Sequence, residues 1–388
     1  MKYINTFKTH ASYEEKLNGG VDISLPNVSY CKDVKDVHFN PYNTVEFYVG
    51  NITGTTPQTV KIYTDRNTSV DIQVSEGNKW YTYVLPKDKG LYRIEGDSVK
   101  KVVVKANINT RDSSIITIIP SSTVEASLKG SNTSNVTDMY SMFNSCYNLT
   151  SLDLSSFDTS KVTNMGSMFE SCIKLTSLDL SNFNTSNLTN MGGMFSNCSS
   201  LKSLDLRNFN TSNVTYMTYM FSKCIGLTSL DLSNFNTSNV TNMNNMFINC
   251  SGLKSLDLRN FNTSNVTSMA SMFDSCSGLT SLDLSNFVTS NVTNMGSMFY
   301  GCKGLTSLDL RNFNTSNVTD MGYMFSGCTS LNSLDLSGWN TSKVTITSMN
   351  KMLHGCTSLT TIRMVGCSQD TIQKITNVKP SGATIVTE

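Results

Sequence analysis

Cysteines and aspartates are the residues of this 388-residue chain whose types and spacing could do chemistry. Nine of its 11 cysteines recur at one phase of a repeat, spaced by 26 residues from Cys146 to Cys328, with Cys356 following after 28. Stacked copies would lie roughly 5 Å apart with parallel Cβ vectors, which is poor disulfide geometry. A metal site would need a histidine or second cysteine beside each one, and none stands there. We therefore predict small buried hydrophobes, and neither a metal nor a cofactor.

Aspartates recur with the same period, each between two leucines, as in Leu178-Asp179-Leu180. Such alternation predicts leucines inside and carboxylates outside. Like charges stacked at about 5 Å repel unless something offsets them, and an arginine follows every second aspartate by two residues. Three interpretations stay open: electrostatic compensation with hydrogen bonds to Ser and Thr, a ligand face for a glycan or a protein, and a divalent-cation column, for which one carboxylate per repeat is sparse. The candidate ligand-binding residues are Asp179, Asp205, Arg207, Asp231, Asp257, Arg259, Asp283, Asp309 and Arg311.

The sequence contains no residue set that is typical of a catalytic site. The three histidines, His10, His38 and His354, lie in segments that we do not expect to meet. No Ser-His-Asp or Cys-His set, HExxH motif or glycine-rich phosphate loop can be drawn. Paired catalytic carboxylates need unlike environments, whereas repeated aspartates share one environment. We expect no enzyme activity.

The elements that must position these residues follow from the repeat. A fixed period of this length predicts a solenoid, in which each unit buries its apolar face only against its neighbours. Residues 162–175 of one copy, VTNMGSMFESCIKL, place apolar residues at helical spacing and predict a short helix. The following residues 175–180 alternate and predict a strand. One strand and one short helix per turn, over about nine turns, gives an α/β leucine-rich-repeat-like solenoid with a parallel sheet.

Three further patterns recur along the repeats. The Met-Phe pairs, such as Met168-Phe169, have core spacing rather than that of a methionine-rich groove. The NTS and NVT triplets match glycosylation acceptors, but we interpret them as Asn, Thr and Ser ladders with turn and cap roles. Variation between copies is concentrated at a few outward positions, which include Tyr216, Tyr219, Tyr300 and Tyr323, and exposed tyrosines are good contact residues.

Composition divides the chain into five segments. Residues 1–39 mix short apolar and charged pieces and predict an N-terminal arm. Six runs rich in Val, Ile and Tyr, punctuated by Gly, Pro, Asp and Asn, predict a small β-sandwich or barrel module at 40–106. Residues 107–131 are expected to form a linker and the N-terminal cap of the solenoid, with 114–119 as a capping strand. The solenoid is predicted at 132–365 and a C-terminal cap at 366–388.

Net charge, composition and the length of apolar runs argue against several kinds of partner. The net charge is +1 and charged residues make up only 15%, so nothing indicates nucleic acid or an anionic membrane. No apolar run is long enough for a membrane helix, and we expect no membrane insertion. The first 16 residues, MKYINTFKTHASYEEK, contain no apolar core of a signal peptide, which leads us to expect synthesis in a cytoplasm.

The repeat unit NVTxMxxMFxxCxxLxxLDLSxFxTS, over residues 132–365, resembles the 26-residue repeat of bacterial and protist surface proteins described as BspA-like leucine-rich repeats, also seen in Mycoplasma lipoproteins. That resemblance implies adhesion and surface recognition without catalytic residues. The opening segment at 7–42 is similar to the N-termini of structural proteins from phages of gut Bacteroidetes.

Three functional hypotheses follow. The first is a phage virion component, a homo-oligomer that attaches to other virion proteins through its N-terminal module and presents the solenoid at the virion surface to bind a host-surface or mucosal protein or glycan. The second is an adhesin at the bacterial cell surface. The third is an intracellular scaffold.

Overall fold

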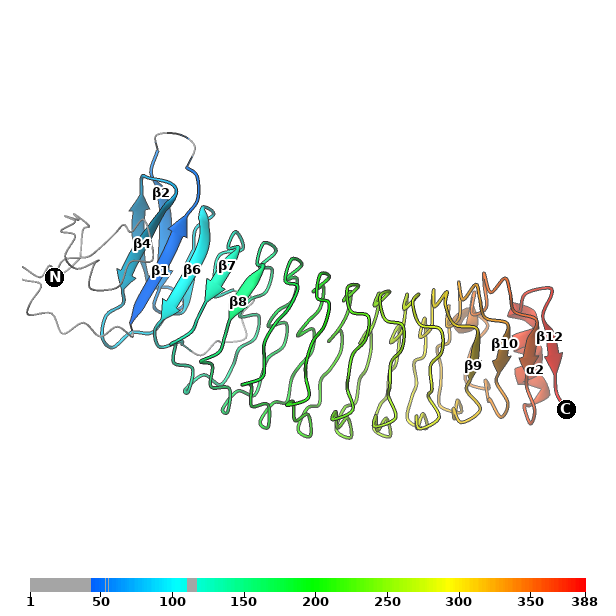
Figure 1. Ribbon diagram of the computed structural model, residues 1–388. Helices are drawn as coiled ribbons and strands as arrows, with labels where there is room; N and C mark the ends of the chain where they lie inside the picture. The colour runs from blue at the N-terminus through cyan, green and yellow to red at the C-terminus, as the bar shows by residue number, and fades with distance from the viewer. Residues whose placement is uncertain (1–42, 53, 55, 110–116) are drawn as a thin grey trace, which may run out of the picture. The chain divides into compact units, whose positions relative to one another are not determined.

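The computed structural model describes residues 43–52, 54, 56–109 and 117–388 (Figure 1). The predicted arm at 1–39 and the phage-like segment, up to residue 42, lie outside these residues. The described residues form a parallel β-solenoid of about 11 turns with few helices. Packing divides the chain into two compact units: the first holds the residues up to Val162 and Cys172–Phe183, and the second holds Thr163–Ser171 and Asn184–Glu388.

The N-terminal β module of the first unit contains all six strands that the sequence predicts. Its core comes from alternation, since Val45, Phe47 and Val49 are fully buried while the residues between them are half-buried. The strands form two antiparallel groups, β4-β1-β6 and β3-β2-β5. Their bounds are β1 Thr44–Val49, β2 Gln58–Tyr63, β3 Ser69–Val74, β4 Lys79–Val84, β5 Arg93–Glu95 and β6 Val99–Lys105.

The same sheet runs on from the module into the first solenoid turns. Strand β6 pairs in parallel with β7 (Glu125–Ser127), and β7 with β8 (Ser151–Asp153), which gives the order β4-β1-β6-β7-β8 (Figure 1). The segment predicted as linker and cap, 107–131, therefore contributes a solenoid strand, β7. Half of the predicted capping strand at 114–119, residues 114–116, lies outside the described residues.

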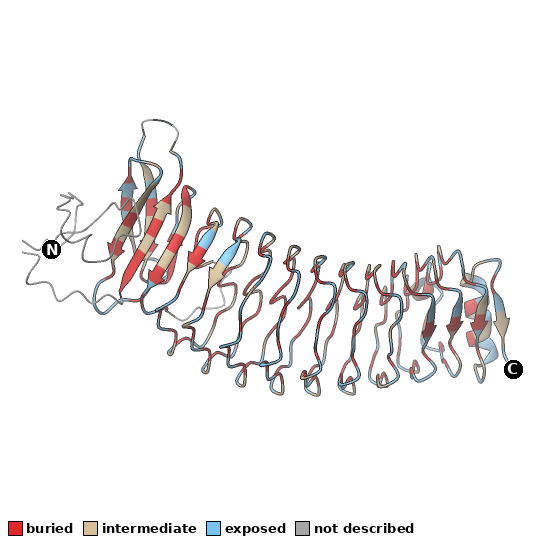
Figure 2. Cartoon of the chain, in the orientation of Figure 1, coloured by how far each residue is buried: buried red, intermediate tan, exposed pale blue. Residues whose placement is uncertain are grey.

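The predicted core positions of the repeats are confirmed, and Figure 2 shows buried residues recurring in every turn. The phenylalanines of successive copies stack, as Phe195 and Phe221 do with ring centroids 5.9 Å apart and planes 8° apart. Such aromatic contacts add to the burial of apolar area that holds neighbouring copies together. In the copy that begins at Val214, the fully buried apolar residues are Val214, Met217, Met220, Phe221, Cys224 and Leu227.

The predicted helix of each repeat is wrong. Two residues per copy have left-handed backbone, for example Tyr219 (φ 59°) and Lys223 (φ 58°), and left-handed residues interrupt an α-helix. Every second amide binds the next copy instead, so that the Tyr219 amide donates to the Asn244 carbonyl (3.1 Å) and the Lys223 amide to the Ile248 carbonyl (2.7 Å). The amides between them close four-residue turns, since the Met220 amide, for example, donates to the Met217 carbonyl (3.3 Å). We call this arrangement the turn ladder; it buries apolar residues at intervals of three and four, as a helix does.

Regular strands occur in only part of the second unit. Its last two Leu-Asp-Leu segments, which overlap β9 and β10, form a parallel sheet with β11 and β12 near the C-terminus, in the order β12-β11-β10-β9. In the described copies between Asn184 and Cys302 the Leu-Asp-Leu segments form no paired strand. The prediction of one paired strand per copy therefore holds only near the C-terminal end of this unit. The bounds are β9 Ser307–Asp309, β10 Ser333–Asp335, β11 Thr361–Arg363 and β12 Thr384–Val386.

Side-chain ladders connect the copies where strand pairing is missing. The Thr211 hydroxyl donates to the Asn236 carbonyl (2.9 Å) and accepts the Asn236 amide (2.8 Å). The Asn234 amide donates to the carbonyls of Leu206 (3.0 Å) and Phe209 (2.6 Å). The predicted Asn and Thr ladders are confirmed, and they satisfy buried backbone groups that a strand ladder would otherwise satisfy.

The C-terminal cap contains a helix that the sequence analysis missed. After the short 3-10 turn η2 (Thr347–Met349), helix α2 spans Gln369–Val378, and the Ser368 hydroxyl caps it by accepting the Thr371 amide. Helix α2 buries Ile375 and lies against the last copy, where Lys374 Nζ donates to the Thr341 carbonyl (2.9 Å). No helix among the described residues is long and apolar enough to cross a membrane.

Candidate binding surfaces

The cysteine column lies in the core of the turn ladder. From Cys172 to Cys356 each thiol of the column donates to a phenylalanine carbonyl of the preceding copy, as Cys250 does to Phe221 (2.9 Å), while the Cys146 thiol pairs with the Thr117 hydroxyl (3.3 Å). Burial raises the pKa of Cys250 and of Cys302 to about 12, which keeps both thiols protonated and poor as metal ligands. All ten described cysteines are free thiols, and the described residues contain no group of three or more His, Cys, Asp or Glu that could hold a metal ion.

The aspartate column, which we call the Asp stripe, points outward as predicted. The leucine before each aspartate is less buried than expected in three copies, since Leu152, Leu178 and Leu282 are half-buried. In every copy from Asp153 to Asp335 one carboxylate oxygen accepts the amide of the residue two positions on, at 3.0–3.1 Å. This bond caps the turn after the Leu-Asp-Leu segment. Side-chain and backbone hydrogen bonds from that residue lower the carboxyl pKa of Asp153, Asp205, Asp231, Asp257, Asp283 and Asp309. The stripe thus has a structural role in every copy.

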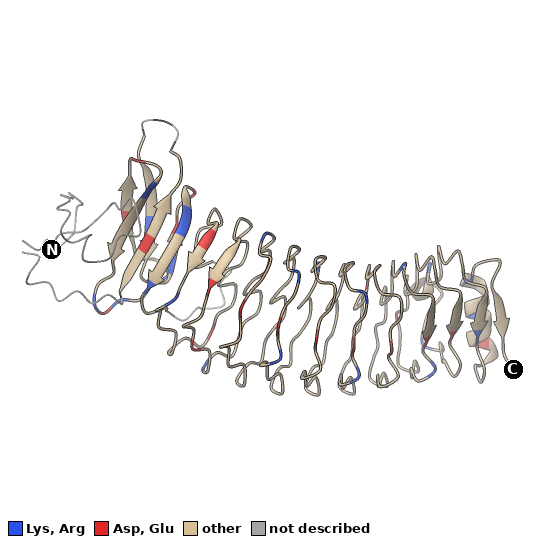
Figure 3. Ribbon diagram, in the orientation of Figure 1, with Lys and Arg blue, Asp and Glu red and all other residues tan. Residues whose placement is uncertain are grey.

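The arginines of the Asp stripe bind the aspartates of their own copies. The Arg207 guanidinium donates twice to Asp205, at 3.0 Å and 2.6 Å, and this bonding lowers the pKa of Asp205 to about 2. Arg207 also attracts Asp231 of the next copy, which explains why one arginine serves two aspartates. Arg259 and Arg311 repeat the arrangement, and charges are otherwise sparse along the repeats (Figure 3). The predicted electrostatic compensation is confirmed, and the ligand-face hypothesis for these residues stays a prediction.

The exposed residues of the turn ladder differ more between copies than the Asp stripe does. The tyrosines that the sequence analysis singled out lie here: Tyr216, Tyr219, Tyr300 and Tyr323 are 48%, 47%, 40% and 38% exposed. Two of them, Tyr219 and Tyr323, occupy left-handed positions where the other copies between residues 141 and 297 have Ser, Asn or Gly. Left-handed backbone is strained for a bulky residue, and such strain is concentrated at functional sites.

Two grooves flank a tyrosine pair on this turn face, which is the exposed surface of the turn ladder. Tyr300 and Tyr323 pack edge to face with centroids 6.5 Å apart. Tyr323 lines a groove of about 690 Å³, and Tyr300 lines one of about 370 Å³. Besides Tyr323, the first groove presents Asn294, Asp320, Lys343, Thr345 and Asn350.

Sequence reasoning missed the groove residues other than the tyrosines. A signal was present, because Asp320 stands where four of the other copies between residues 164 and 294 have asparagine. Aligning the copies column by column, and asking which columns vary, would have found it.

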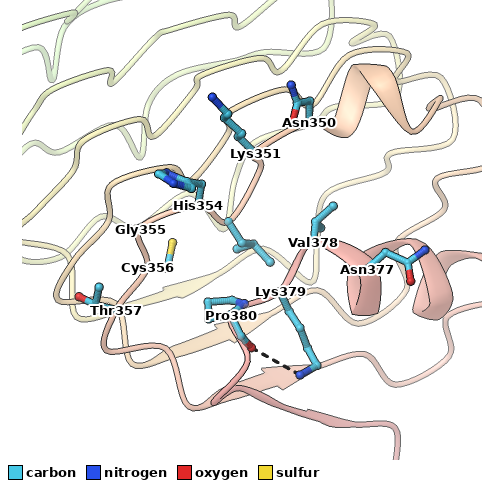
Figure 4. A pocket seen from close by; sticks show the side chains of 11 residues that line it. Asn350, Lys351, His354, Gly355, Cys356, Thr357, Asn377, Val378, Lys379 and Pro380 are labelled. Carbon is cyan, nitrogen blue, oxygen red and sulfur yellow. Dashed lines mark hydrogen bonds between the residues drawn. The ribbon is translucent and has the colours of Figure 1, made fainter.

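A third pocket lies between the last copy and helix α2 (Figure 4). Its volume is about 390 Å³, and Lys351, His354, Val378 and Lys379 are among the residues that line it. Lys379 Nζ donates to the carbonyls of Pro380 (3.4 Å) and Ala383 (2.7 Å), so this ammonium is already used within the cap. The pocket could not be predicted, because one wall is the helix that the sequence analysis missed.

Fold and surfaces together define a repeat solenoid protein. The chain belongs to the family described as Mycoplasma protein of unknown function, DUF285, whose model matches residues 117–229, 175–281, 219–307 and 279–379. A solved structure of a leucine-rich-repeat protein from Leptospira interrogans is similar at 11% identity, covering 69% of this chain and 90% of that chain, with a TM-score of 0.19. No curated protein matches the sequence. Neither similarity names BspA-like or phage proteins, so those resemblances stay predictions.

Proposed function

We propose that this chain is a non-enzymatic binding protein whose turn face holds a protein or glycan ligand. The observation that carries the proposal is the contrast between two surfaces of one solenoid. The Asp stripe repeats almost unchanged and uses its hydrogen bonds internally, as Asp205 and Arg207 do. The turn face varies from copy to copy and exposes tyrosines in strained positions. A ligand that contacts one place on a repeat array needs this kind of variety.

Catalysis is not part of the proposal. Each described aspartate of the stripe accepts the same turn amide, and most have carboxyl pKa values below the usual range, lowered by hydrogen bonds from the residue two positions on. A general acid needs a raised pKa, which these residues lack.

The place of display is a second part of the proposal. We place the protein at the virion surface, as a homo-oligomer attached through its N-terminal module, because its N-terminal segment resembles phage structural proteins. A bacterial cell-surface adhesin is the alternative, supported by the resemblance of the repeats to BspA-like proteins, and an intracellular scaffold is the second alternative.

An immunoblot tests the place of display. Gradient-purified particles, washed cells and cell-free medium of the producing culture are compared. Enrichment in particles is the expected result. Signal restricted to the cell envelope would replace the virion assignment with the adhesin, and signal restricted to the cytosol would favour the scaffold.

A further inference from the structure

We infer that the groove beside Tyr323 is a binding site for a neutral oligosaccharide. The inference rests on the proposed binding function and assigns it a site and a ligand class. Consecutive copies line the groove, from Ala270 to Asn350, and the two-residue insertion of the last copy adds Thr347 to its lining. A volume of about 690 Å³ falls within the usual range of small-molecule sites.

The lining of the groove favours a ligand rich in hydroxyl groups. Apart from Tyr323, its side chains are hydroxyls, amides, one carboxylate and one ammonium group, and Ala270 supplies the one aliphatic group among the residues that line it. A peptide helix would need an apolar groove, and a nucleic acid would need an excess of positive charge. A sugar needs hydrogen-bonding groups together with an aromatic surface for its C–H face, and this groove offers both.

Asp320 provides a carboxylate that is fixed in place within the groove. One of its oxygens accepts the Gly322 amide (2.9 Å), which fixes the carboxylate in place. The other lies over Gly296, 3.2 Å from where a Cβ would stand, and has no hydrogen-bond partner among the described residues. Asn294 is held in the same way by the Gly296 amide (2.8 Å). A carboxylate and an amide on adjacent copies can bind neighbouring hydroxyls of one sugar ring.

Tyr323 provides the aromatic surface. Its ring packs edge to face with Tyr300, and Lys351 Nζ lies over the ring, 5.7 Å from the centroid. A ring fixed in this way loses little conformational freedom when a ligand stacks on it. The left-handed backbone of Tyr323 (φ 56°) is the cost of placing an aromatic side chain here.

The repeat supplies substitutions that preserve the fold. Asp320→Asn and Tyr323→Ser introduce residues found at the same positions of other copies, so the turn bond and the left-handed backbone are retained. Tyr147→Ser and Ile225→Ser are matched controls at exposed apolar residues. Serine stands at the same position in other copies, as at Ser199 and Ser251, and neither control residue lines the groove.

The experiment applies the full-length chain and these four variants to an array of neutral and acidic oligosaccharides, with calorimetry on the best binder. We expect a neutral oligosaccharide to bind, about tenfold loss for each groove variant, and unchanged binding for the controls. Equal binding by wild type and both groove variants would overturn this site while keeping the binding function. Absence of glycan binding would overturn the ligand class. A parallel array of immobilised extracellular proteins then separates a protein-binding surface from failure of the proposed function itself.

Discussion

The Sγ of Cys250 lies 2.9 Å from the carbonyl oxygen of Phe221 in the preceding copy, and the thiol donates to it. The same bond recurs for Cys198, Cys224, Cys276 and Cys302 at 3.0–3.1 Å. This dry column of donors satisfies carbonyl groups that lie between one copy and the next. Cysteine suits the position because it is small, apolar and still carries a weak donor.

The cysteine column should make the fold sensitive to alkaline pH. Burial raises the pKa of Cys250 and Cys302 to about 12 from 9.0, so the folded chain keeps protons that the unfolded chain releases. Their contribution is fully present below about pH 9 and is lost as pH rises towards 12, by about 1.4 kcal/mol per pH unit for each thiol. Urea midpoints should therefore be similar at pH 8 and 9 and fall at pH 10 and 11, and this fall should be less steep in Cys250→Ala/Cys302→Ala. Midpoints that stay constant from pH 9 to 11 would contradict the buried column.

At the left-handed positions, glycine should stabilise the fold relative to alanine, which is the reverse of its effect in a helix. Asn245 has φ 60°, where glycine is unstrained and alanine is not. We expect Asn245→Gly to be more stable than Asn245→Ala by about 1 kcal/mol. The helix that the sequence spacing predicts would give the opposite order by a similar amount. Chemical denaturation measures the free energy of unfolding of the two variants. The sign of the difference between them distinguishes the turn ladder from a helix.

In the Asp stripe, loss of the turn cap should reduce stability more than loss of the charge pair. Asp257→Ala removes the acceptor for the Arg259 amide and should lower the melting temperature, whereas Arg259→Ser introduces the residue of alternate copies and should leave the melting temperature nearly unchanged.

Arg259→Ser should also raise the pKa of Asp257 from about 2, because the hydrogen bond from the guanidinium is the largest cause of the lowered value. Since the folded pKa lies below 3.8, the contribution of Asp257 to stability is present above about pH 3.8 and fades as pH falls towards 2. Carboxyl NMR titration measures the pKa; an unchanged value in Arg259→Ser would exclude the pairing.

Packing of helix α2 should protect the amides of the last copy from hydrogen exchange. Ile375 is fully buried, and its truncation to alanine should cost about 2–4 kcal/mol. Because each copy of a solenoid contacts only its neighbours, hydrogen exchange should accelerate around Val344–Leu359 and stay unchanged around Val214–Leu227. Gln373→Ala, on the exposed side of α2, is the control. Uniform acceleration along the chain would show global coupling instead.

Repeat period and burial pattern sufficed to predict the solenoid, its buried residues and the strands of the N-terminal module. The helix prediction failed because Met217, Met220, Phe221 and Cys224 have spacings that two consecutive turns and a helix share. Only backbone conformation separates the two. Most left-handed positions of the turn ladder carry Ser, Asn, Tyr or Lys, and glycine, which would indicate that conformation, stands only at Gly193, Gly301, Gly327 and Gly355 among the described copies.

The binding surface was harder to predict than the fold. Sequence reasoning chose the Asp stripe because its charges repeat, but regular repetition is what structural roles produce, as the cap from Asp205 to the Arg207 amide shows. The groove around Asp320 and Tyr323 depends on departures from the repeat and on which copies meet in space, and spacing along the chain does not reveal that.

The most direct test of the central claim compares the two surfaces in one binding assay. The labelled full-length chain is titrated by flow cytometry onto intact cells of the producing culture, beside two variants built from residues that other copies carry. The turn-face variant is Tyr216→Asn/Tyr219→Ser/Tyr300→Ser/Tyr323→Ser, and the stripe variant is Arg207→Ser/Arg259→Ser/Arg311→Ser. We predict at least about tenfold weaker binding for the turn-face variant and wild-type binding for the stripe variant. Loss of binding in the stripe variant, with the turn-face variant unaffected, would contradict the account.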